Sequence, residues 1–93
     1  MDLRNKVDNI INAHSIKAQQ SSYDRDTCVL AVLSARETML VIPNELTGDA
    51  YSQAVLEALE VLFNRYHDPD GEFTSGRSVI GAILDDIRAA LEE

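Results

Sequence analysis

Apolar residues recur at intervals of three and four along three stretches of this chain. This spacing gathers them on one face of an α-helix, and such a face needs other helices to cover it. The stretches run from 2 to about 20, from about 49 to 66, and from Ser75 or Ser78 to the C-terminus. Their apolar stripes are Leu3, Val7, Ile10, Ile11 and His14, then Tyr51, Val55, Leu59, Leu62 and Tyr66, then Ile80, Ile83, Ile87 and Leu91.

The ends of these stretches carry helix signals of their own. Asp2 is placed to cap the first helix through its side chain. Asp49 lies in the first turn of the next one, where the helix dipole favours an acid. Pro69 and Gly71 together break the chain before the last stretch. Three separate amphipathic helices are therefore predicted.

Residues 27–42 are the ambiguous part, because a short apolar run fits either a helix or a pair of strands. The helical interpretation gives a stripe that Val29, Leu33 and Leu40 widen, a cap at Asp24 or Asp26, and a stop at Pro43. That stripe consists of Cys28, Val32, Ala35, Met39 and Ile42. A hairpin would have to turn at 34–37, which holds no Gly, Asn, Asp or Pro. We therefore favour the helix.

These elements predict an all-α fold, a compact bundle of about four short helices. Residues 1–93 form a single domain in this interpretation, and the alternative is an α+β fold with a hairpin at residues 27–42. An apolar fraction of 45% with 26% charged residues is typical of a globular chain. With 93 residues, a full core leaves no room for a deep substrate cavity, which argues against an enzyme.

Several observations predict a cytoplasmic location. The N-terminal residues are charged and lack the apolar stretch of a signal peptide. No run approaches the roughly 18 apolar residues that span a bilayer. The one cysteine, Cys28, lies in the most apolar part of the chain, which fits a reducing compartment.

The net charge of −8 belongs almost entirely to the second half of the chain. Residues 1–46 hold six acids and five bases, whereas residues 47–93 hold ten acids and three bases. A surface of this sign repels nucleic acid and anionic membrane, and it attracts basic partners. We expect a protein partner, with no direct binding of nucleic acid or membrane.

The turn at 66–73 has the composition of part of a calcium-binding loop, but it lacks the ends of one. With Gly71 at the sixth position, Tyr66 takes the first position and Arg77 the twelfth, and neither is a calcium ligand. His67 and its neighbouring acids suit a transition metal chemically, yet a flexible turn supplies fixed ligands poorly. We predict no metal site and no cofactor.

Catalysis has little support in the sequence. Cys28 lies in an apolar run, where a thiol is normally inert, and its pairing with His14 would require two helices to face each other there. His14 is expected at the edge of the core with a neighbour satisfying its nitrogen. Asp85 and Asp86 are adjacent in a helix and so point in different directions. We predict no catalytic residues.

The remaining interpretation is a small acidic protein-interaction module: an adaptor, a regulatory subunit or an inhibitor. It would bind through an apolar strip that the small core leaves uncovered, since residues 27–42 are apolar around most of the helix. Tyr51, Phe63 and Tyr66 are the candidate aromatic anchors. Self-association into a homodimer would also bury such a strip.

An alternative function rests on charge. Rows of carboxylates on two neighbouring helices would imitate the phosphates of DNA and occupy the basic groove of a nucleic-acid-binding protein. The candidate contacts are Glu57, Glu60, Asp85 and Asp86. Bacteriophages and mobile elements encode compact acidic inhibitors of this type, an analogy of size and charge.

Overall fold

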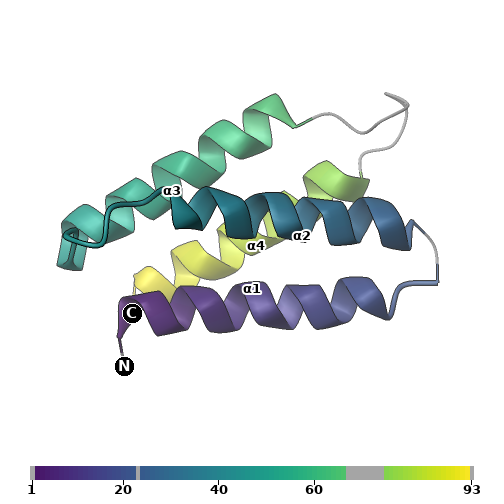
Figure 1. Cartoon of the computed structure of the whole chain (residues 1–93), viewed down its shortest axis with the longest axis horizontal. Helices are drawn as coiled ribbons and strands as arrows, with labels where there is room; N and C mark the ends of the chain where they lie inside the picture. The colour runs from purple at the N-terminus through teal and green to yellow at the C-terminus, as the bar shows by residue number, and fades with distance from the viewer. Residues whose placement is uncertain (1, 23, 67–74, 93) are drawn as a thin grey trace.

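Four α-helices make up the described part of the chain in the computed structural model, which covers residues 2–22, 24–66 and 75–92 (Figure 1). They are α1 (Leu3–Gln19), α2 (Arg25–Leu40), α3 (Gly48–Arg65) and α4 (Ser75–Leu91). The prediction of an all-α bundle is confirmed, and within these residues there is no strand. The hairpin alternative at 27–42 is therefore wrong.

The helices pack unequally. α1, α2 and α4 each contact the other two, whereas α3 packs mainly on α4 and on α2. α1 and α2 run antiparallel side by side, and α3 crosses at an angle to them (Figure 1). α2 thus has neighbours on its inner side only, which decides the character of its outer side.

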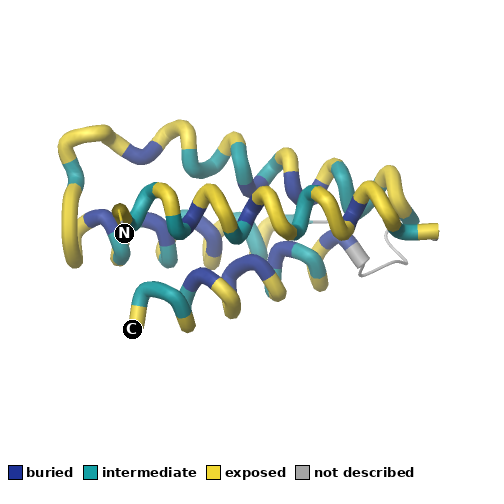
Figure 2. The backbone as a smooth tube through the Cα atoms, turned by 90° about the horizontal axis from the view of Figure 1, so that it is seen from below, coloured by how far each residue is buried: buried dark blue, intermediate teal, exposed yellow. Residues whose placement is uncertain are grey.

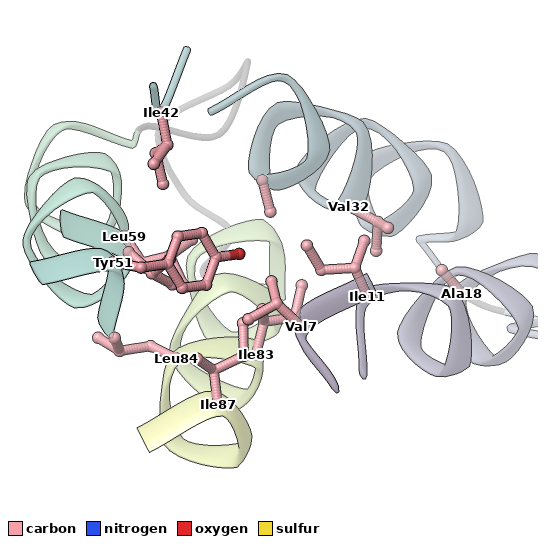
Figure 3. Packing of buried hydrophobic residues seen from close by; sticks show 12 residues of the cluster. Val7, Ile11, Ala18, Val32, Ile42, Tyr51, Leu59, Ile83, Leu84 and Ile87 are labelled. Atoms are coloured by element: carbon pink, nitrogen blue, oxygen red, sulfur yellow. The ribbon is translucent and has the colours of Figure 1, made fainter. Parts of the chain in front are cut away.

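The core is built from the predicted stripes, whose buried residues face the inside of the bundle (Figure 2). Figure 3 shows side chains from all four helices converging there. The fully or nearly fully buried members are Val7, Ile11, Val32, Ala35, Tyr51, Val55, Leu59, Ile80, Ile83 and Ile87. A helical period of three and four thus brings each stripe to one common interior.

The helix ends follow local chemistry. Asp2 caps α1, and its Oδ1 accepts a hydrogen bond from the Arg4 backbone N–H at 3.3 Å. Asp24 takes the cap position of α2 with a left-handed backbone (φ 56°), and its side chain makes no capping hydrogen bond. Gly48 opens α3 at φ +57°, a conformation that a residue with a Cβ adopts only with strain. α4 begins at Ser75, so Ser78 lies inside the helix and is not its cap.

α2 differs from its predicted stripe in one respect. Leu33 and Leu40, which were expected to widen the buried stripe, are exposed. Its inner face is occupied by the small side chains of Ala31 and Ala35 together with Val32, and this face alone meets the other helices. The outer leucines consequently have no helix against which to pack.

Candidate protein-binding surface

The outer side of α2 carries most of the large apolar side chains that the described residues expose. Leu30, Leu33 and Leu40 are 52%, 46% and 79% exposed, and Val41 at the end of the helix is 78% exposed. Positions 30, 33 and 40 share one side of a helix because they are separated by three and seven residues. We call these four residues the α2 apolar face.

Two carboxylates interrupt the α2 apolar face. Asp26 and Glu37 are exposed and share its side of the helix. Neither makes an ion pair or a side-chain hydrogen bond with any residue that the structure describes. Arg36, which precedes Glu37 in the sequence, instead donates from Nη2 to Asn12 Oδ1 of α1 at 2.8 Å. The two acids are therefore available to a partner.

The Arg36–Asn12 hydrogen bond also fixes the register between α1 and α2. α1 and α2 run antiparallel (Figure 1). The residue one helical turn after Asn12 in α1 therefore lies at the same level along the helix axes as the residue one turn before Arg36 in α2. Ile16, which is 59% exposed, thus lies at the level of Leu33.

Tyr51, which the sequence placed both in the apolar stripe and among the candidate anchors, lies in the core. It is 4% exposed, and its ring points into the core (Figure 3). The Arg4 guanidinium lies 4.4 Å from the ring centroid, and its Nη2 donates to the carbonyls of Pro43 (2.8 Å) and Leu46 (3.3 Å). Burial raises the pKa of the Tyr51 hydroxyl, an effect that nearby Arg4 partly offsets. This cluster joins α1, the 41–47 connection and α3.

The other two aromatic anchors lie at the far end of α3. Phe63 is half-buried, and a Cβ on Gly81 of α4 would lie 3.1 Å from its ring. Arg77 stacks 4.0 Å from the ring centroid, and its Nε donates to the Phe63 carbonyl at 3.2 Å. Tyr66 is half-buried just after α3. Phe63 thus joins α3 to α4 and presents only part of its ring to solvent.

The acidic side chains proposed as a row divide between two sides of α4. Glu60 Oε1 and Asp85 Oδ1 lie 2.9 and 3.7 Å from the guanidinium of Arg88, between α3 and α4. Asp86 instead faces α1, where its Oδ2 is 2.7 Å from His14 Nε2. Glu57 is exposed without a partner among the described residues. The four carboxylates do not form one row, and three of them already contact a basic or imidazole group.

His14 occupies the predicted edge position, with its side chain 13% exposed and its nitrogen bonded to Asp86. It shares the lining of a cavity of about 260 Å³ with Cys28, so α1 and α2 do bring these two side chains to one place. Most of the remaining lining is small or aliphatic and comes from α1 and α4. From the sequence, a pairing of Cys28 with His14 required that the two helices face each other at these positions. The sequence could not predict this, because the register between α1 and α2 was unknown.

The turn that resembled a calcium loop and the metal candidate His67 lie outside the described residues, except for Tyr66 and Arg77. Elsewhere in the chain that the structure describes, no three His, Cys, Asp or Glu side chains are grouped so as to hold a metal ion. None of the helices in these same ranges combines the length and the apolar character needed to cross a bilayer.

Comparison with protein-family models, with curated protein sequences and with solved structures finds no match to this chain. The candidate surface thus rests on the geometry of its own residues. Leu33 and Leu40 were the part that sequence reasoning assigned to the wrong side of α2. The sequence signal for their exposure is that α2 is apolar around nearly its whole circumference, whereas the other helices cover only one side of it.

Proposed function

We propose that this protein is a protein-interaction module that binds its partner through the α2 apolar face. The observation that carries the proposal is the exposure of Leu30, Leu33, Leu40 and Val41 on one side of the bundle. Single exposed apolar side chains are normal, but a contiguous group of them is typical of a binding surface. An adaptor, a regulatory subunit or an inhibitor acts by binding and needs no catalytic group.

The free-energy argument also favours a partner here. Burying a leucine completely is worth about 1.5–3 kcal/mol, so half-exposed leucines retain much of that gain for binding. Three leucines on one rigid helix also lose little conformational entropy when they bind. The pairing of Glu60, Asp85 and Asp86 within the chain gives the acidic DNA-mimic alternative less support.

The test compares captured proteins between matched variants. The tagged chain with Leu33→Gln and Leu40→Gln removes the apolar contacts while retaining side-chain length and helix propensity. Val61→Gln is the control, because Val61 is 48% exposed but belongs to α3 and not to the α2 apolar face. Circular dichroism verifies that all forms are equally helical, since exposed substitutions typically change stability by less than about 0.5 kcal/mol.

The expected result is a partner that the wild-type protein and the Val61→Gln control retain at high salt and that the double variant loses. Retention at high salt identifies an apolar contact, because salt screens exposed charges. Equal capture by all three forms, or equal loss from both variants, would show that the α2 apolar face is not the binding surface.

A further inference from the structure

The acids and leucines on the outer side of α2 form one regular stripe. Asp26, Leu30, Leu33, Glu37 and Leu40 follow one another at intervals of four, three, four and three. All five are exposed, and the stripe spans about 21 Å at 1.5 Å per residue. This is the spacing with which one helix meets another along a seam, whereas an extended strand advances more than twice as far per residue. The geometry suits a helical partner.

Charge decides between kinds of helix. Asp26 and Glu37 lie about 16 Å apart along the axis of α2 and have no ion pair within the described residues. A docked helix would displace part of the water that solvates these two carboxylates. This loss of solvation is unfavourable unless the partner helix brings opposite charges to them. Two basic side chains placed eleven positions apart along the partner helix would meet both acids.

A second copy of this chain fits the stripe less well. An antiparallel pair centred near Leu33 would place Glu37 of each copy beside Leu30 of the other, which buries an acid against an apolar side chain. Each copy also carries a net charge of −8, so the two chains repel each other.

We propose that the partner segment is a basic amphipathic helix that packs along the α2 stripe and places basic side chains against Asp26 and Glu37. This inference rests on the proposed function, since it names the partner of the same surface. Leu30 and Leu33 form the apolar centre of the contact, and the two acids set its register and its preference for charge.

The test uses two labelled helical peptides that differ only in charge. Both carry leucines in a heptad pattern, and the basic probe has lysine at two positions eleven apart where the acidic probe has glutamate. Fluorescence anisotropy with the full chain at low salt measures each affinity. The basic probe should bind at least about tenfold more tightly, the effect of two favourable charge contacts replacing two unfavourable ones.

Charge reversal provides the matched variants. Asp26→Lys with Glu37→Lys should invert the preference, so that the acidic probe binds more tightly than the basic one. Glu57→Lys with Glu92→Lys is the control, because it changes the net charge by the same amount at exposed acids away from the stripe. The control should weaken binding of the basic probe only slightly and should retain the preference.

Four results would overturn the inference. If both probes bind equally, or if the control inverts the preference as fully as the stripe variant does, the acids do not select the partner. If neither probe binds, the stripe does not accept a basic helix. If sedimentation shows a wild-type dimer that Leu33→Gln and Leu40→Gln dissociate, the occupant is a second copy. The capture experiment with the leucine variants is independent of the probe results and decides separately whether the α2 apolar face binds a protein.

Discussion

Replacing Arg4 by alanine should destabilise the fold by about 2 kcal/mol, because this side chain makes three contacts at once. Its two hydrogen bonds to the Pro43 and Leu46 carbonyls join α1 to the connection between α2 and α3. Since the Pro43 bond is exposed and water can replace it, the two bonds together contribute about 1–1.5 kcal/mol. The stacking on Tyr51 adds about 0.5–1 kcal/mol.

Thermal unfolding followed by circular dichroism measures the effect. A domain of this size loses about 4–8 °C in Tm for each kcal/mol, so Arg4→Ala should lower Tm by about 8–16 °C. Arg4→Lys retains the charge but lacks the flat guanidinium that lies over the Tyr51 ring while its Nη2 donates to both carbonyls, and it should lose about half as much. Arg25→Ala is the control, because Arg25 is exposed and has no partner among the described residues. The reasoning fails if Arg4→Ala matches this control or if Arg4→Lys is as stable as the wild type.

Three further predictions concern the core and the charged groups. Leu59→Ala should lower the free energy of unfolding in urea by about 2–5 kcal/mol, whereas Leu40→Ala should lower it by less than about 1 kcal/mol, since only Leu59 is fully buried. Equal losses would contradict the assignment of Leu40 to the outer side of α2. Because the folded pKa of Tyr51 is raised above its ordinary value of 10.0, the stability due to its neutral form is present below pH 10 and is lost as the pH rises through the folded pKa; Tyr51→Phe should flatten this alkaline decline. Glu60→Gln should cost less than about 1 kcal/mol, because the ion pair with Arg88 is half-exposed, and a larger loss in 0.5 M salt than in dilute buffer would refute this.

The sequence predicted the elements better than it predicted their contacts. Periodicity located the four helices, and Asp2 identified the cap of α1 because a capping side chain acts within three residues of itself. Leu33 and Leu40 were assigned to the buried side because α2 is apolar nearly all round, so its periodicity does not distinguish the inner side from the outer side. Only the positions of α1, α3 and α4 make that distinction.

Site residues that depend on two helices were the hardest to predict. The spacing of Tyr51 fitted both a core residue and an anchor, and the guanidinium that covers it comes from Arg4, 47 positions earlier in the chain. Asp85 and Asp86 were correctly expected to point apart. Asp85 pairs with Arg88 three positions later in α4, whereas the partner of Asp86 is His14 on α1, which only the packing of the helices brings near. No local pattern in a single sequence encodes such long-range pairs.

The close approach of Phe63 to Gly81 constrains how this chain can change during evolution. With the present ring, any side chain at position 81 places its Cβ 3.1 Å from Phe63, so the ring or the two helices must shift by a few tenths of an ångström. A smaller residue at 63 would open that space. The two positions are therefore expected to covary among descendants of this chain, with bulk gained at one only after bulk has been lost at the other.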